Sequence, residues 1–213
     1  MVEAIIWDFG GVLTSSPFEA FNRFEAGAGL ARDFIRRVNA TDPDTNAWAQ
    51  FESAQIDGAA FDALFAIESE RLGRRIQGAD VLKLLSGDIR PKMVAALEAC
   101  RARFKVGCIT NNVKSGAGAG MAGSVEKASA VGAIMERFHH VIESSKVGIR
   151  KPDPRIYALM CEALDVDPKA CVYLDDLGIN LKPARAMGMA TIKVESEAQA
   201  LAELVALTGI DHP

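Results

Sequence analysis

Three short apolar segments of this sequence each end at a polar residue, and this pattern limits the possible folds more than any other feature. Short continuous apolar runs are typical of strands buried on both faces of a sheet. Segments with helical spacing lie between them, so we expect a doubly wound, Rossmann-like α/β fold with a parallel sheet. The apolar segments and the polar residues that follow them are 4–7 with Asp8, 105–109 with Thr110-Asn111, and 170–174 with Asp175-Asp176.

The polar residues after these segments are expected at one rim of the sheet, because ligands of such sheets bind beyond the carboxyl ends of the strands. Two further strands are predicted at residues 140–142 and 191–194. The helices predicted between the strands cover residues 93–103, 125–137, 155–164 and 180–187. The rim is therefore the place to look for a functional site.

Residues 17–85 differ from the rest of the chain, because they lack β-branched runs and carry aromatic residues at helical spacing. The pattern predicts an all-helical insertion after the first strand, which would cover the rim as a cap. Most of its aromatic side chains are expected to pack in the core of this insertion. We therefore predict a core domain of residues 1–16 and 86–213 and a helical cap domain of residues 17–85.

Composition and charge exclude several kinds of partner. The 213 residues carry a formal net charge of −4 and contain no basic stripe, so we expect no nucleic-acid partner. No apolar stretch approaches the roughly 20 residues of a spanning helix, and the first residues do not resemble a signal peptide. The four cysteines form no C-x-x-C pair and are expected to be reduced and buried. The sequence thus favours a cytoplasmic protein that does not bind membranes.

The acidic residues at the expected rim are candidates for chemistry. Asp8 is followed by Gly10 and Gly11, whose backbone allows an anion to approach closely, and an aspartate there can act as a nucleophile. Taken alone, this segment is better explained by a turn. Asp175 and Asp176 add two carboxylates, which suit Mg²⁺, although a solvated turn explains the pair as well.

Thr110, Asn111 and Lys151 could complete a phosphate site. The Thr110 hydroxyl and the backbone N–H of Asn111 can donate hydrogen bonds to phosphate oxygens. Lys151 precedes a helix that starts at a proline, and its ammonium group could neutralise both the nucleophile and the phosphate. A single lysine is usually a solvated surface residue, so the combination of residues carries the interpretation.

Four motifs in this order resemble those of the haloacid dehalogenase-like (HAD) hydrolase superfamily. They are W-D-F-G-G-V-L-T, C-I-T-N-N, V-G-I-R-K-P-D-P-R-I-Y and V-Y-L-D-D-L-G-I-N-L-K-P-A-R-A-M-G-M. The last two are especially similar to the group that contains the N-terminal phosphatase domain of soluble epoxide hydrolase and acyl-CoA dehydrogenase family member 10. The resemblance covers nearly the whole chain and implies a Mg²⁺-dependent hydrolase with an inserted cap.

The resemblance also implies a role for each matched residue. Asp8 would be the nucleophile and a Mg²⁺ ligand, together with Asp176 and the backbone carbonyl of Gly10. Asp175 would act beside Asp176, directly or through water, and Asn180 would order their loop. The phosphate would be bound by Thr110, Asn111, Gly11 and Lys151. Lys151 matches the third motif better than Lys146 does.

One departure from the family pattern concerns the catalytic acid. Phosphatases of this superfamily usually carry a second aspartate two residues after the nucleophile, where this chain has Gly10. A positioned acid or base typically contributes ~10²–10⁴-fold to the rate. The favoured interpretation is a phosphatase for small metabolites with good leaving groups. The alternatives are a 2-haloacid dehalogenase, which the paired acids disfavour, and a weakly active relative that binds a phosphorylated ligand or a protein.

Two further hypotheses concern proton transfer and the access of substrates to the site. Glu19, Ser15 or Ser16 could relay protons, since they lie near Asp8 in the sequence. The Gly/Ala/Ser-rich segment 115–124 is expected to be a mobile loop that gates the site. The sequence leaves the substrate open, and it is compatible with a monomer or a homodimer.

Overall fold

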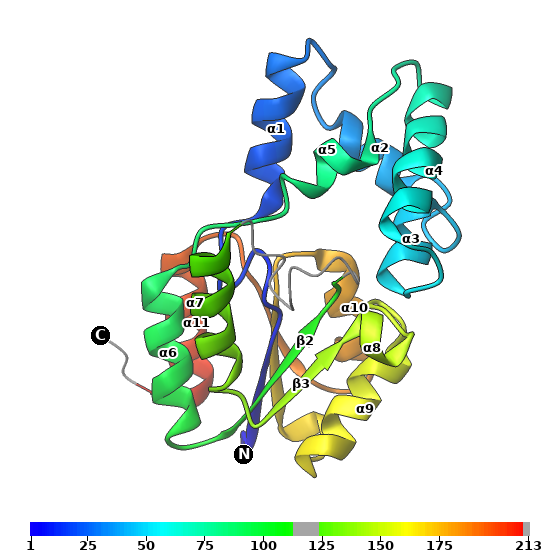
Figure 1. The fold of residues 1–213 in the computed structure, drawn as a ribbon. Coiled ribbons are helices and arrows are strands. Elements are labelled where there is room, and N and C mark those ends of the chain that lie inside the picture. The colour runs from blue at the N-terminus through cyan, green and yellow to red at the C-terminus, as the bar shows by residue number, and fades with distance from the viewer. Residues whose placement is uncertain (113–123, 211–213) are drawn as a thin grey trace.

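The core of the protein is a five-stranded parallel sheet with the strand order β3-β2-β1-β4-β5 (Figure 1). The computed structural model describes residues 1–112 and 124–210. The predicted gating loop therefore lies almost entirely outside the described residues. The strands are β1 (Ala4–Trp7), β2 (Lys105–Thr110), β3 (His140–Glu143), β4 (Cys171–Asp175) and β5 (Ala190–Lys193). The sheet confirms the predicted α/β fold.

Helices cover both faces of the sheet, and alternate residues of each strand point to opposite faces. Ile5 and Trp7 pack on one side against α6, α7 and α11, while Ala4 and Ile6 pack on the other side against α9 and α10 (Figure 1). These helices are α6 (Pro91–Arg101), α7 (Val125–Met135), α9 (Pro154–Leu164), α10 (Gly178–Ala186) and α11 (Glu197–Thr208), and a short α8 (Ser144–Val147) follows β3. The strand order reverses at β1, which marks the rim beyond β1 and β4 as the expected site.

Three core elements were not predicted, namely α8, α11 and the short 3₁₀ helix η1 (Pro168–Ala170). The other core elements were predicted to within about three residues, the usual uncertainty of such boundaries. A signal for α11 exists, because Ser196 and Gln199 form a capping box at its start. Ala200, Leu201 and Leu204 of α11 are buried in the same apolar cluster as β1 residues. The capping box in the first turn of α11 was therefore a signal for this helix in the sequence, whereas α8 is too short to give a periodic pattern.

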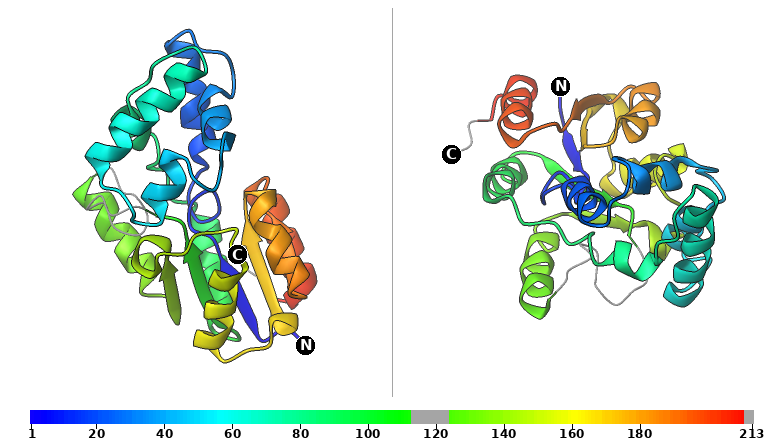
Figure 2. Two further views of the ribbon diagram at one scale, coloured as in Figure 1. Left: turned by 90° about the vertical axis from the view of Figure 1, so that its right-hand side faces the viewer. Right: turned by 90° about the horizontal axis from the view of Figure 1, so that it is seen from above.

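The described elements between residues 17 and 85 are all helices, as predicted. They are α1 (Pro17–Gly27), α2 (Phe34–Ala40), α3 (Ala47–Glu52), α4 (Gly58–Arg71) and α5 (Gly78–Leu82). We call them the cap helices. They lie beyond the carboxyl ends of the strands (Figures 1 and 2) and have an apolar cluster of their own. Phe61 lies at its centre, with ring centroids 4.7 Å from Phe51 and 5.2 Å from Trp48.

The two chain segments that join the cap helices to the core run side by side. Ser15 N–H donates to Asp88 C=O (2.7 Å), and Arg90 N–H donates to Leu13 C=O (2.9 Å). Thr14 and Ile89 form an antiparallel bridge between these segments. Across the described residues, no helix is long and apolar enough to cross a membrane.

Candidate active site

Asp8 lies at the centre of the rim, directly after β1. Its backbone N–H donates to Leu174 C=O (2.8 Å), which continues the pairing of β1 with β4. Its carboxylate Oδ1 accepts the N–H of Phe9 (2.7 Å), and the residue is 7% exposed. Burial raises the pKa of Asp8 well above its usual range, against the attraction of Lys151. A neighbouring cation would favour the ionised form of Asp8, the form that can act as a nucleophile.

Lys151 is buried between two carboxylates. Its Nζ lies 2.8 Å from Asp8 Oδ1 and 2.8 Å from Asp175 Oδ2, and the residue is 1% exposed. Burial alone would lower the pKa of this ammonium group, but the carboxylates of Asp175 and Asp8 outweigh burial and raise it. Lys151 is therefore a fixed positive charge beside Asp8 and not a solvated surface residue.

Asp175 is fully buried and accepts hydrogen bonds on both oxygens. Oδ1 accepts from Leu177 N–H (2.8 Å), Oδ2 accepts from Lys151 and from the Tyr173 hydroxyl, and Asn180 Nδ2 donates to both oxygens (3.1 and 3.0 Å). Asn180 thus orders this loop, as expected. With so many protein donors, Asp175 is better suited to orient Lys151 than to bind a metal directly.

Asp176 points toward the glycine turn that follows Asp8. The Ser16 hydroxyl donates to its Oδ2 (3.0 Å), and a Cβ at Gly11 would lie 2.1 Å from the same oxygen. Gly11 also has φ +75°, a conformation that favours glycine, so this position admits no side chain. Burial, together with the charge of Asp175, raises the pKa of Asp176 to about 6.

The rim can hold a divalent cation. Asp8, Asp175 and Asp176 each offer an oxygen atom, and these atoms lie within 4.8 Å of one another. Lys151 is the one positive side chain that pairs with Asp8 and Asp175 in the described structure, so the acids carry an excess of negative charge there. Clustered carboxylate oxygens are the ligands that Mg²⁺ prefers, so the residues present fit the expected metal. A Cβ at Gly10 would meet nothing within 4 Å, which leaves space beside the acids.

Thr110 and Asn111 reach the same rim from the end of β2, but the two side chains are placed differently. Thr110 is buried at the last position of the strand. The Asn111 side chain binds the backbone of Lys151, because its Oδ1 accepts Lys151 N–H (2.8 Å) and its Nδ2 donates to Lys151 C=O (3.1 Å). Asn111 can therefore offer its backbone N–H to a phosphate while its side chain holds Lys151 in place.

Of the other sequence candidates, Lys146, Glu19 and Ser15 lie apart from these contacts. Lys146 is exposed and pairs with Glu143, in agreement with the choice of Lys151. Glu19 is exposed on α1, and the Ser15 hydroxyl accepts Asp88 N–H (2.9 Å), whereas Ser16 reaches Asp176. Among the three residues proposed as proton relays, only Ser16 touches an acid of the site.

Sequence reasoning missed three residues that contact the site. Tyr173 lies two positions before Asp175 on β4, so strand alternation could have placed both side chains on one face. Arg90 Nη1 donates to Gly11 C=O (2.9 Å) across 79 residues, and no local signal indicated this contact. Glu52 on α3 is 7% exposed and binds Asn111 and Arg150. Burial raises the pKa of Glu52.

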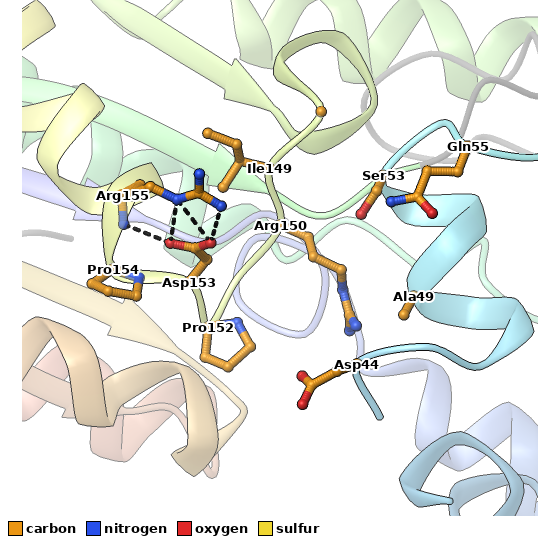
Figure 3. Close-up of a pocket in the computed structure, with 11 residues that line it drawn as sticks. Asp44, Ala49, Ser53, Gln55, Ile149, Arg150, Pro152, Asp153, Pro154 and Arg155 are labelled. Carbon is orange, nitrogen blue, oxygen red and sulfur yellow. Dashed lines mark hydrogen bonds and ion pairs between the residues drawn. The ribbon is translucent and has the colours of Figure 1, made fainter. Parts of the chain in front are cut away.

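A pocket of about 430 Å³ lies beside the rim, between α3 and the segment around Lys151 (Figure 3). Figure 3 shows the Arg150 side chain extending toward α3, with Asp44 near its end. The lining residues are Asp44, Ala49, Ser53, Gln55, Gly148, Ile149, Arg150, Pro152, Asp153, Pro154 and Arg155. None of the three acids lines this pocket, so it is adjacent to the candidate active site and separate from it.

Comparison with known sequences confirms the resemblance seen in the motifs. Residues 2–188 match the family model for haloacid dehalogenase-like hydrolases. Bifunctional epoxide hydrolase 2 and acyl-CoA dehydrogenase family member 10, both of Mus musculus, are each 32% identical over 97% of this chain. The chain spans 39% and 19% of these two relatives, respectively.

Comparison with solved structures confirms the fold. A HAD family enzyme of Bacteroides thetaiotaomicron, in complex with magnesium and inorganic phosphate, has a TM-score of 0.60 at 18% identity, with 92% of this chain and 96% of that chain covered. An L-2-haloacid dehalogenase of Xanthobacter autotrophicus with covalently bound chloropropionic acid has a TM-score of 0.62 at 19% identity, with 99% and 85% covered. At these identities the likeness concerns the fold alone.

Proposed function

Because the chain belongs to the haloacid dehalogenase-like hydrolase family, we propose that it is a Mg²⁺-dependent phosphatase for a small phosphorylated metabolite. The observation that carries this proposal is the buried pair of Asp8 and Lys151, 2.8 Å apart, beside a cluster of three carboxylates. An aspartate paired with a fixed ammonium group can attack phosphorus and form a covalent aspartyl-phosphate. The three clustered carboxylates can bind a metal ion, and this favours a phosphate substrate.

We assign the metal ligands from the donors that the rim offers. Asp8 and Asp176 would bind Mg²⁺ directly, the backbone carbonyl of Gly10 would be a further ligand, and Asp175 would act through water because its oxygens already accept protein hydrogen bonds. Bound there, Mg²⁺ would screen the phosphate from the acids and polarise it. The Bacteroides enzyme, which is similar in fold, was observed with magnesium and inorganic phosphate, so a Mg²⁺ site is compatible with this fold.

The first step would transfer the phosphoryl group to Asp8. A carboxylate oxygen of Asp8 bonds to phosphorus, and the bond between phosphorus and the leaving oxygen breaks, with its electron pair staying on that oxygen. Lys151, the Thr110 hydroxyl and the N–H groups of Asn111 and Gly11 would hold the phosphate oxygens and stabilise their charge. Tyr173 and Asn180 contribute by fixing Asp175, which in turn holds Lys151.

In the second step water would attack phosphorus, which releases inorganic phosphate and restores the Asp8 carboxylate. No carboxylate at position 10 protonates the leaving oxygen or activates this water. The enzyme should therefore favour leaving groups that need little protonation, such as those of acyl phosphates or anomeric sugar phosphates. A rate lower by ~10²–10⁴-fold is expected for ordinary monoesters.

A 2-haloacid dehalogenase is the second candidate, favoured by the missing acid at Gly10, since a halide leaves without a proton. The structural likeness to the Xanthobacter dehalogenase fits this candidate as well as it fits a phosphatase, because it concerns the fold. Asp176 argues against it, because a dehalogenase needs no metal ligand. Turnover of 2-chloropropionate in the absence of Mg²⁺ would favour this candidate.

We further propose that residues 17–85 act as a cap that closes over the rim and selects the substrate, on a core of residues 1–16 and 86–213. The proposed setting is the cytoplasm, as a monomer or homodimer without nucleic-acid or membrane partners. The Phe and Trp side chains of the cap that are only partly buried, such as Phe18 and Trp48, are candidates for the entrance.

The decisive experiment measures hydrolysis of acetyl phosphate and para-nitrophenyl phosphate with and without Mg²⁺. We expect turnover that depends on Mg²⁺. Asp8→Asn should lower kcat by at least ~10⁴-fold, because the residues around a nucleophile cannot take over its role. Gly10→Asp should raise turnover of para-nitrophenyl phosphate, since position 10 has space for a side chain.

Two outcomes would contradict the phosphatase proposal. Turnover that survives in Asp8→Asn would exclude Asp8 as the nucleophile. A folded protein that binds Mg²⁺ and phosphate but shows no turnover would instead indicate a binding role for a phosphorylated ligand.

A further inference from the structure

Glu52 is a cap carboxylate whose contacts reach the core. It is the last residue of α3, and its Oε1 accepts the indole N–H of Trp48 (2.9 Å) within the same helix. Its Oε2 accepts Asn111 Nδ2 (3.2 Å) and lies 2.7 Å from Arg150 Nε. A buried carboxylate loses its hydration, so these partners are needed to hold it in place.

Asn111 connects Glu52 to the catalytic lysine. The same amide group that donates to Glu52 also donates to Lys151 C=O, and its oxygen accepts Lys151 N–H (2.8 Å). The backbone of Lys151 is thereby fixed on both sides of its Cα, and its Nζ lies 2.8 Å from Asp8 Oδ1. An unbroken series of polar contacts therefore runs from α3 to Asp8.

Arg150 provides a second connection at the same place. Its Nη1 donates to Pro43 C=O (2.9 Å) in the segment before α3, while its Nε faces Glu52. Glu52 and Arg150 thus join α3 and the preceding segment to the residue next to Lys151. A carboxylate that only stabilised the cap would not need partners on the core.

We propose that Glu52 is a positioning residue that makes the placement of Lys151 depend on the docking of α3. It acts through Asn111 and Arg150 and does not touch the substrate. The inference deepens the proposed phosphatase function and rests on it. When α3 leaves the core, Asn111 and Arg150 each lose a partner, so the Asn111 side chain that holds the backbone of Lys151 is less firmly fixed. The site would therefore be fully ordered only with the cap in place.

The test compares Glu52→Gln and Glu52→Leu with Glu68→Gln and Glu68→Leu. Glu68 is the matched control, because its Oε1 accepts Ala47 N–H (2.8 Å) at the start of α3 and burial also raises its pKa. Both carboxylates therefore support the same helix, and only Glu52 contacts Asn111 and Arg150. Three quantities are measured: kcat and KM for acetyl phosphate with Mg²⁺, the ¹⁵N NMR signal of Lys151 Nζ, and thermal unfolding.

We expect a graded loss of kcat at position 52. Glu52→Leu removes the acceptor and the charge and should lower kcat ~10–100-fold with little change in KM, the usual cost of displacing a group that orients a catalytic residue. Glu52→Gln keeps an acceptor for Asn111, so its kcat should fall less than that of Glu52→Leu. Both variants should shift the Lys151 Nζ signal, whereas the Glu68 variants should lower thermal stability and leave kcat and that signal unchanged.

Equal losses of kcat at positions 52 and 68, or an unchanged Lys151 signal in Glu52→Leu, would overturn the inference. If Glu52→Leu does not fold, the same comparison is made with Glu52→Gln. If the wild-type protein hydrolyses no phosphate, the phosphatase proposal fails independently. The Lys151 Nζ signal still decides whether Glu52 positions the lysine in that case.

Discussion

The rim of the sheet and the cap helices are stabilised in different ways. At the rim, charged groups are buried and held by several partners each, as with Asp175, which accepts from Lys151, Tyr173 and Asn180. In the cap, the centre is a cluster of aromatic rings around Phe61. Hydrogen bonds fix direction, whereas apolar packing is largely non-directional.

This difference fits the separate roles proposed for the two regions, with the chemistry at the rim and the selection of substrates in the cap. The groups assigned to the chemistry lie where strand pairing and polar contacts fix their positions. The apolar cluster of the cap lies apart from these groups and tolerates volume-conserving changes more readily, which suits a part that selects substrates. Three predictions test this comparison, beginning with the largest expected effect.

Replacing Lys151 should be the most damaging change to the rim. Lys151→Met leaves Asp8 and Asp175 buried without their cation, which should lower the free energy of unfolding by ~3–5 kcal/mol at pH 7. Lys146→Met is the control, because Lys146 is 71% exposed in its side chain and should cost less than ~0.5 kcal/mol. Urea unfolding measures both, and equal losses would show that the rim does not depend on its buried lysine.

A cavity in the cap should lower the stability of the cap more than that of the sheet. Phe61→Ala removes a fully buried ring and should cost about 3 kcal/mol, as large-to-small substitutions in cores do. Phe24→Ala, on a partly buried residue of α1, should cost less. Hydrogen exchange should show faster exchange in α3 and α4 while β1 and β4 stay protected. Loss of protection in the sheet would mean that the two regions unfold as one.

The smallest expected effect concerns the charge on Asp176. Burial raises its pKa in the folded protein to about 6, so its contribution to stability is complete below the unfolded pKa of about 3.9 and is lost as the pH rises through about 6. Without metal, Asp176→Asn should therefore be more stable than the wild type at pH 8, by ~1–2 kcal/mol after allowance for partial exposure, and equal to it below pH ~4.

Thermal unfolding in a chelator, across this pH range, measures the Asp176 effect. Added Mg²⁺ should then stabilise the wild type and not Asp176→Asn, because a ligand that binds the folded state raises its stability. A difference between the two proteins that does not change with pH would show that the charge on Asp176 is not the cause.

Much of the rim could be read from the sequence because its signals are local. An apolar run that ends at Asp8 or at Asp175 predicts both a strand and the position of a carboxylate at its end. The absence of an acid at Gly10 is equally visible without coordinates. The helices of the cap followed from aromatic spacing, whereas α11 was missed although its capping box was present.

Amino-acid order by itself determined the strands, their parallel arrangement and the chemical groups that each strand delivers to the rim. Only the tertiary structure decided how these groups pair. The Asn111 side chain turned out to hold Lys151, and its other partner, Glu52, lies 59 residues away in the sequence. Periodicity reports which face of an element is buried, and it carries no information about which distant side chain will meet a given carboxylate.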